Sequence, residues 1–471
     1  MSEDIAGLTL SQVADAIRDR KISSVEATQA CLNQMARLGP VLDCLAEVDP
    51  ESALAAAAEA DAELAAGRSR GPLHGVPLAH KDMYYRAGRV SGCGSKIRAD
   101  FKPTETSAVL ERLDAAGALD IARLNMVEFA LGVTGHNEVM PTPRNPWNTD
   151  YITGGSSSGP GSAVAGRLIY GAFGSDTGGS IRFPATCCGL VGMKPTYGRV
   201  SRRAAMALSH SLDTLGPMTR TVADNALLLR TTAGHDRRDA TSSRLPVSDY
   251  MVGIEHGVAG LKIAVPENYF YDPVDGEVAA LVRASLDVLT DAGAELVSVT
   301  IPDSITATNA MSSLITSTEG ASLHQKWLQE RPGDYGRQTH SRMSSGLYTP
   351  ATRYLQALRL RPAILAEFAE AVFEDADVLH IPTMIDPVPT IAESDLAANP
   401  GYLDRITAMG HCTRPINYLG LPSLTLPCGF TANGLPMAFQ LVGRPFDEAT
   451  LYRAGHAYER DTEWTARAPK L

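Results

Sequence analysis

Apolar side chains in the first part of the chain, about residues 1–67, recur every three or four positions. This spacing is typical of helices that pack one face on a core. Ser23 and Glu26 form the pattern of a capping box, which marks the start of one helix. The alanine-rich stretch that follows predicts another helix, ending near Gly67 because glycine is favoured just beyond helix termini. We therefore expect a helical N-terminal segment.

Short apolar runs punctuated by glycine and proline begin after this segment and predict strands. The stretch LHGVPLAHKDMYY, residues 73–85, fits a buried strand. Residues 107–124 and 277–301 each show a helical pattern, a glycine stop at Gly117 or Gly293, and then a strand pattern. The strand-like segment 261–266 precedes the helix and strand predicted over 277–301. The three elements form a β-α-β unit, which favours parallel pairing.

These patterns together predict an α/β fold. We expect a single large domain over residues 1–471, with a central mixed, mostly parallel twisted β-sheet covered by helices on both faces. No change of composition forces a domain boundary. The expected parts are the helical segment of about 1–67, a catalytic core of about 70–225, a variable region of about 230–350 that shapes the substrate pocket, and a C-terminal completion of the core of about 351–471.

Composition narrows the classes of partner and compartment. The chain has 471 residues, 44% of them hydrophobic, and a formal net charge of −11. This charge argues against nucleic acid or an anionic membrane as partner, because both require a basic surface. No long apolar run and no signal peptide are found, and the seven scattered cysteines include no C-x-x-C pair. We expect a cytoplasmic protein with reduced thiols and without a metal or cofactor.

Two glycine- and serine-rich turns are candidates for the catalytic site. The first, residues 155–159, matches the G-x-S-x-G elbow of α/β-hydrolases with Ser157 as nucleophile. That elbow requires a strand directly before it, and the preceding NPWNTDYITG, with Pro146 and two asparagines, is a poor strand. An esterase with Ser157 as nucleophile therefore stays an alternative.

The second turn, DTGGSIRFP at residues 176–184, is the stronger candidate for the catalytic site. Three successive amides from Gly178 to Ser180 can point the same way and stabilise an oxyanion, with Ser180 as nucleophile. The base would be Lys81, which must be neutral to accept a proton. Because neighbours in a strand point to opposite faces, Asp82 should face away from Lys81 and leave it unpaired.

The two glycine-rich turns and the strand of Lys81 together resemble the amidase signature family. GGSSSGPGSAVAGRLIYGAFGSDTGGSIRFPA, residues 154–185, is similar to the family's Gly/Ser-rich signature, and GPLHGVPLAHKD to its lysine strand. The similarity extends over nearly the whole chain and is thinnest from 230 to 350. Three positions depart from the family pattern: Thr153, the pair Pro160-Gly161 and Arg123.

The resemblance implies a Ser–Ser–Lys triad. Ser180 matches the nucleophile, Ser156 the bridging serine whose peptide bond is cis in this family, and Lys81 the base. Other positions match supporting roles: the backbone of Thr177, Gly178, Gly179 and Ser180 as the oxyanion hole, and Asp176, Arg182 and Ser157 as residues that brace it.

The family also implies the activity, which is hydrolysis of C–N bonds in primary amides, aryl amides and carbamates (urethanes). An alternative is the glutaminase subunit of a glutamine-dependent tRNA amidotransferase, in which Arg361 would match an arginine for the glutamine carboxylate. A binding protein that has kept the fold is a third interpretation. The expected partner is a small amide or carbamate, and the sequence leaves a homodimer open.

Overall fold

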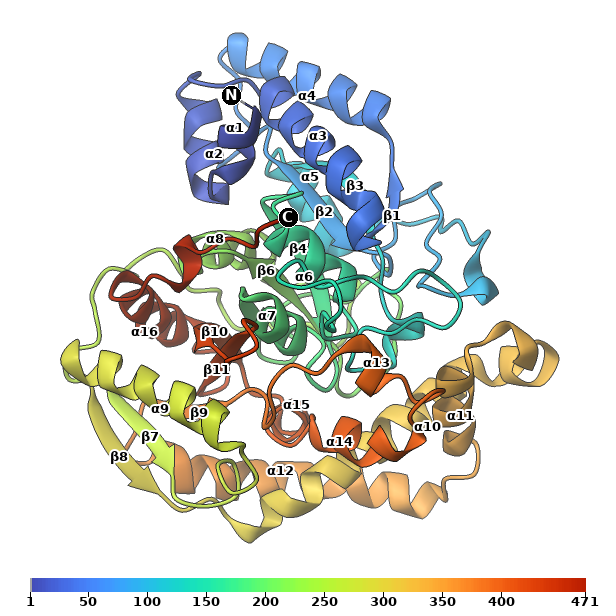
Figure 1. Ribbon diagram of the computed structural model, residues 1–471, viewed down its shortest axis with the longest axis vertical. Coiled ribbons are helices and arrows are strands. Elements are labelled where there is room, and N and C mark those ends of the chain that lie inside the picture. Colours follow the sequence, from blue (N-terminus) through green and yellow to red (C-terminus); the bar gives the residue numbers. More distant parts are fainter. Residues whose placement is uncertain (1) are drawn as a thin grey trace.

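One sheet of 11 strands runs through the computed structural model, which describes residues 2–471 (Figure 1). The order of the strands across the sheet is β1-β3-β2-β4-β6-β5-β10-β11-β9-β7-β8. Their bounds are β1 Leu45–Val48, β2 Pro77–Lys81, β3 Leu119–Leu124, β4 Gly171–Asp176, β5 Val191–Lys194, β6 Thr214–Thr219, β7 Lys262–Pro266, β8 Glu295–Val299, β9 Val378–Pro382, β10 Ser423–Phe430 and β11 Pro436–Gly443.

Two layers of helices cover the sheet. The α-helices are α1 Ser2–Gly7, α2 Leu10–Arg18, α3 Ser24–Leu42, α4 Pro50–Ala65, α5 Ala108–Ala115, α6 Ser158–Ala165, α7 Arg182–Cys188, α8 Val222–Thr232, α9 Gly276–Asp291, α10 Thr308–Glu330, α11 Arg337–Gly346, α12 Ala351–Phe373, α13 Ile391–Ser394, α14 Leu403–Ala408, α15 Arg414–Leu419 and α16 Glu448–Arg460. One layer, α6 and α7, and another, α8, α16 and α9, contact the central strands. None of the helices within the described chain is long and apolar enough to cross a membrane.

The prediction of a mostly parallel sheet is wrong. Parallel pairing is confined to β3–β2–β4 and β8–β7–β9. Every other neighbouring pair of strands is antiparallel. The β-α-β patterns visible in the sequence belong to the two parallel parts, where a helix makes the crossover. The strands between them include the hairpin β10–β11, whose short connection permits only antiparallel pairing.

The N-terminal segment is helical as predicted, apart from one strand. Ser23 and Glu26 make the reciprocal capping box at the start of α3. The four-residue strand β1 between α3 and α4 was not expected, and it adds to the edge of the sheet beside β3. Its side chains are half-buried or exposed, so the sequence shows no alternation of apolar and polar residues there.

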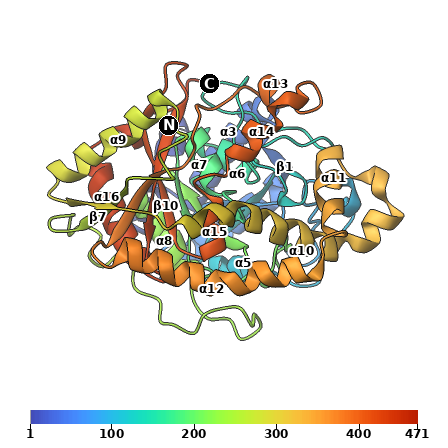
Figure 2. The ribbon, with the colours of Figure 1, turned by 90° about the horizontal axis from the view of Figure 1, so that it is seen from below.

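The segments between β8 and β9 form a helical arm across one side of the molecule. Figure 1 shows α10, α11 and α12 in the lower part of the molecule, and Figure 2, from below, shows α10 and α12 running along each other. These two helices are in contact, and α10 also packs on α15. Two helices of the arm, α10 and α11, share a pocket with the second glycine-rich turn, which follows β4.

Candidate active site

Lys81 ends β2 with its side chain fully buried. Its Nζ lies 2.8 Å from the hydroxyl oxygen of Ser156 and 2.9 Å from that of Ser175. Burial lowers the pKa of Lys81 to about 7, against the opposing charges of Asp213 and Asp176. A substantial fraction of the amine is therefore neutral at physiological pH, and it contacts the hydroxyl of Ser156, which the family resemblance predicts to be the bridging serine.

The residues beside Lys81 in the sequence face away from it, as the alternation of a strand requires. Asp82 is buried and accepts a hydrogen bond of 2.6 Å from Arg123. His80 contacts Asp120 at 2.8 Å. Within residues 2–471 no carboxylate lies within 4.0 Å of the Lys81 amine. Arg123, one of the departures from the family pattern, thus neutralises the acid adjacent to Lys81.

Ser156 follows a cis peptide bond from Gly155. Its carbonyl accepts a hydrogen bond from the amide of Val127, and the Gly155 amide donates to Val133. The next residue, Ser157, is fully buried, and its hydroxyl is hydrogen-bonded to the backbone of Ser175.

The nucleophile-elbow alternative does not fit these surroundings. Residues 152–157, which precede α6, form no strand, although the elbow needs a strand there. Ser157 is also shut off from solvent. The esterase interpretation with Ser157 as nucleophile is therefore wrong.

Ser180 lies in the turn between β4 and α7. Its hydroxyl has no hydrogen-bond partner in the described part of the chain, and its side chain lines a pocket. Gly179 before it has φ +126°, and a Cβ there would lie 2.4 Å from the ring of Phe183. Only glycine fits this bend, which turns the Ser180 side chain toward the pocket.

Asp176 and Arg182 brace this turn from beneath. Both are fully buried and form an ion pair at 3.0 Å. The carboxylate of Asp176 also accepts hydrogen bonds from the amides of Gly179 and Ile181. The charge and hydrogen bonds of Arg182 outweigh burial and hold the pKa of Asp176 well below its usual value. The turn is therefore fixed by a charged, fully bonded network.

One of the four amides expected in the oxyanion hole is occupied. The Gly179 amide donates to Asp176 at 2.8 Å, so it holds the turn and is not free for a ligand. The amides of Gly178 and Ser180 have no partner among residues 2–471. The Thr177 hydroxyl donates to Asp213 at 2.6 Å. The prediction that the Gly179 amide belongs to the oxyanion hole is therefore corrected. The spacing of the motif could not show which amide donates a hydrogen bond to the neighbouring carboxylate.

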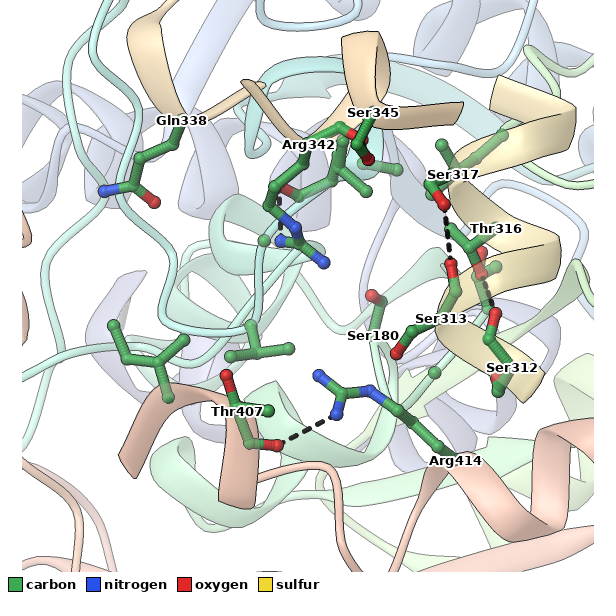
Figure 3. A pocket seen from close by; sticks show the side chains of 18 of the residues that line it. Ser180, Ser312, Ser313, Thr316, Ser317, Gln338, Arg342, Ser345, Thr407 and Arg414 are labelled. Atoms are coloured by element: carbon green, nitrogen blue, oxygen red, sulfur yellow. Dashed lines mark hydrogen bonds between the residues drawn. The ribbon is translucent and has the colours of Figure 1, made fainter. Parts of the chain in front are cut away.

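The pocket in front of Ser180 has a volume of about 360 Å³ (Figure 3). Its walls come from the turn that holds Ser180, from the segment 130–133, from α10 and α11, and from residues 403–414. Hydroxyl side chains of α10 and α11 make up much of the polar wall, and leucine, valine and isoleucine side chains make up much of the apolar wall.

Two arginines of the pocket were missed from the sequence. Arg342 of α11 and Arg414 of α15 point their guanidinium groups into the pocket near Ser180 (Figure 3). Arg361, which the sequence suggested for a carboxylate, does not line the pocket; it donates to the carbonyl of Ser211 and lies over the ring of Tyr197. No local motif distinguishes Arg342 or Arg414 from the other arginines of the chain.

The arrangement has the parts that acyl transfer requires. A deprotonatable amine touches one serine hydroxyl, a second serine faces the pocket, and unoccupied amides lie beside it. Over residues 2–471 no group of three or more His, Cys, Asp and Glu side chains is placed to hold a metal ion.

Comparison with known proteins shows which family the chain is similar to. The family model described as Amidase matches residues 26–452. A Glutamyl-tRNA(Gln) amidotransferase subunit of Chloroflexus aurantiacus is 39% identical, with 98% of each chain covered.

Solved structures are similar as well. An inhibitor-bound structure, described as a vestigial protein complex that reveals the evolutionary origins of an s-triazine catabolic enzyme, superposes with a TM-score of 0.89 at 31% identity, covering 98% of this chain and all of the other. A Glutamyl-tRNA(Gln) amidotransferase subunit of Thermotoga maritima superposes with a TM-score of 0.78 at 30% identity, covering 98% of this chain and 94% of the other.

Proposed function

Because the chain belongs to the amidase family, we propose that it is an amidohydrolase that cleaves C–N bonds through an acyl-enzyme on Ser180. One observation supports this most strongly: the buried, unpaired amine of Lys81 lies 2.8 Å from the hydroxyl of Ser156. A lysine that is neutral near pH 7 can act as a general base, which an exposed lysine cannot.

In the proposed reaction Lys81 accepts the proton of Ser156 while Ser156 accepts that of Ser180. The Ser180 oxygen bonds to the carbonyl carbon, and the free amides of Gly178 and Ser180 stabilise the oxyanion. The C–N bond then breaks, and the amine leaves with a proton returned through Ser156. Water adds to the acyl-enzyme by the same proton route, which releases the acid and restores Ser180.

The substrates of this chemistry share a carbonyl bonded to nitrogen. Primary amides, aryl amides and carbamates (urethanes) all fit the mechanism. The leaving amine requires a proton, and Ser156 is placed to supply it from Lys81. A pocket of about 360 Å³ suits a small molecule.

A second candidate is the glutaminase subunit of a glutamine-dependent tRNA amidotransferase, which works together with other subunits. The names of the relatives that are 37–40% identical over nearly the full chain favour it. The chemistry at Ser180 would be the same, with glutamine as the amide and ammonia passed to a partner. The position of Arg361 outside the pocket does not support glutamine binding by that residue.

The test compares purified wild-type protein with the variants Ser180→Ala and Lys81→Met. Amine or ammonia release is measured from 4-nitroacetanilide, benzamide, a phenyl carbamate of 4-nitroaniline and glutamine. Ser158→Ala is the matched control, because this buried neighbour of the site has no hydrogen-bond partner for its hydroxyl. We expect turnover of a non-glutamine amide that is lost in both site variants, by at least about 1000-fold, and kept in the control.

Two other results would contradict the proposal. Turnover that survives Ser180→Ala would remove Ser180 as nucleophile. Hydrolysis restricted to glutamine, and seen only after partner subunits are added, would establish the amidotransferase function instead.

A further inference from the structure

The pocket in front of Ser180 carries positive charge without any acid to balance it. Arg342 and Arg414 are its only charged residues in the described chain, and no aspartate or glutamate lines it. Neither guanidinium lies within 4.0 Å of a carboxylate anywhere in residues 2–471, in contrast to the buried Arg182, which pairs with Asp176 at 3.0 Å. Unpaired cations inside a pocket are costly unless a ligand supplies the counter-charge.

Arg414 is held against the turn that carries the nucleophile. Its guanidinium donates a hydrogen bond of 2.9 Å to the carbonyl of Thr407, which leaves its other donors free. An ideal Cβ built on Gly178 would lie 3.4 Å from Cγ of Arg414, so the arginine lies directly against the expected oxyanion hole. The preceding Thr413 donates to the Gly178 carbonyl at 2.7 Å, which fixes this contact.

Gly410 makes room for the guanidinium of Arg414. A Cβ at position 410 would lie 2.5 Å from Cζ of Arg414 and 2.6 Å from its Nε. Any side chain there would push the guanidinium out of its place. The local sequence thus provides space for this arginine in one orientation.

Arg342 reaches the pocket from the other wall. It belongs to α11, and its guanidinium donates to the carbonyl of Leu131 at 3.2 Å. Its side chain lines the pocket and is exposed to solvent. Burial lowers the pKa of Arg414 to about 10, and the nearby charge of Arg342 contributes to this shift. The two cations therefore repel each other across the pocket.

We propose that the amide substrate of this enzyme carries a carboxylate, which Arg342 and Arg414 bind together beside Ser180 (Figure 3). This inference rests on the proposed function and names the class of substrate. A carboxylate is planar and accepts two hydrogen bonds side by side, which matches the guanidinium donors. Binding it would relieve the repulsion between the two arginines.

The remaining walls define the rest of the substrate. Leu131, Val133 and Ile406 offer an apolar surface for a short hydrocarbon stem between the carboxylate and the amide. The pocket has no acid to receive an ammonium group, and two cations would repel one. The substrate class is therefore a short acid amide without a free amine. Glutamine, which has an α-ammonium, should be a poor substrate.

The experiment uses matched pairs of primary amides. Malonamate, succinamate, glutaramate and adipamate are each compared with the amide in which an isopropyl group replaces the carboxylate. Glutamine is compared with glutaramate, which lacks only its amino group. Ammonia release gives kcat/KM for the wild-type protein and for Arg342→Met and Arg414→Met. Arg337→Met is the matched control, because Arg337 lies on the same helix, is exposed and does not line the pocket.

We expect at least one acid amide to be preferred over its neutral partner by tenfold or more in kcat/KM. That preference should fall at least tenfold in Arg342→Met and in Arg414→Met and persist in Arg337→Met. Glutaramate should exceed glutamine by at least tenfold. Arg414→Lys, which keeps the positive charge, should retain part of the preference if Arg414→Met folds poorly, and Gly410→Ala should lose it.

The outcomes separate this inference from the proposed function. Turnover of neutral amides as good as that of acid amides, with the same ratio in the arginine variants, would overturn the carboxylate site and leave the amidohydrolase standing. Glutamine preferred over glutaramate would also overturn it. Failure of every amide would overturn the proposed function. Calorimetric titration of the Ser180→Ala protein with glutaramate then decides the inference, which fails if binding is absent or unaffected by Arg342→Met.

Discussion

At the level of single residues, the chemistry of the site depends on where Lys81 is buried. Because side chains alternate along the strand, Asp82 and His80 face away from Lys81, where they contact Arg123 and Asp120. The amine of Lys81 is left among hydroxyl groups. This separation follows from the sequence once the strand is assigned. The depth of burial does not, because it depends on elements that pack around β2 from distant parts of the chain.

The pH dependence of activity should report this burial. Only neutral Lys81 accepts a proton, so kcat/KM should rise with pH through an apparent pKa near 7 and level off above it. Below that value it should fall about tenfold per pH unit, because the ammonium form predominates. The measurement is the pH profile of amide hydrolysis between pH 5 and 9. A flat profile would contradict Lys81 as the base.

Lys194 provides the control for this assignment. It is also fully buried, and burial lowers its pKa to about 7, but its amine donates to the carbonyl of Pro195 and does not line the pocket. The acidic limb of the profile should persist in Lys194→Met. Loss of the limb in that variant would assign the titration to Lys194.

At the level of elements, α10 forms one wall of the pocket and must be held in place. Its buried Glu319 accepts hydrogen bonds from Ser209, from Ser211 and from Tyr354 of α12. Burial, which raises the pKa of Glu319, is outweighed by these hydrogen bonds, so the pKa stays below its usual value. A single carboxylate therefore ties α10 to α12 and to the loop before β6.

Replacing this carboxylate should loosen the pocket wall. Glu319→Gln keeps the shape but turns one acceptor oxygen into a donor, so we expect a loss of about 2 kcal/mol of unfolding free energy. KM should also rise, because α10 lines the pocket through Ser312, Ser313 and Thr316. Urea unfolding and steady-state kinetics measure the two effects. Glu330→Gln, exposed at the end of the same helix, should change stability by less than about 0.5 kcal/mol. Equal effects of both variants would contradict this role of Glu319.

At the level of the whole molecule, the core encloses every cysteine. All seven are buried and unpaired. Burial raises the pKa of Cys31, Cys44 and Cys93 to about 12, so their thiols stay protonated at neutral pH. This agrees with the reduced thiols expected from their scattered spacing.

The native protein should therefore not react with Ellman's reagent on the time scale of minutes, and seven thiols should react after unfolding in guanidinium chloride. A reducing agent should leave the melting temperature unchanged. A thiol that reacts quickly in the native protein would show that the core opens more readily than its packing indicates.

The sequence by itself determined a large part of the fold and of the candidate site. Regular spacing of apolar residues located the helices and the β-α-β units, because that spacing is a property of each element by itself. Ser180 and Lys81 were predicted from short motifs, since tight turns and buried strands place demands on residues close together in the chain, and Ser156 was predicted from the family resemblance. The direction of the central strands was not found, because pairing depends on connections between elements and on neighbours far away in sequence.

Only the tertiary structure decided how the pocket is charged. Arg342 and Arg414 stand on separate helices, far from Ser180 in the chain, and nothing near either of them marks it as unpaired. Whether an arginine finds a carboxylate depends on all the surfaces that fold around it. The candidate reacting groups could thus be predicted from local sequence, whereas the walls of the pocket exist only once distant helices meet over the sheet.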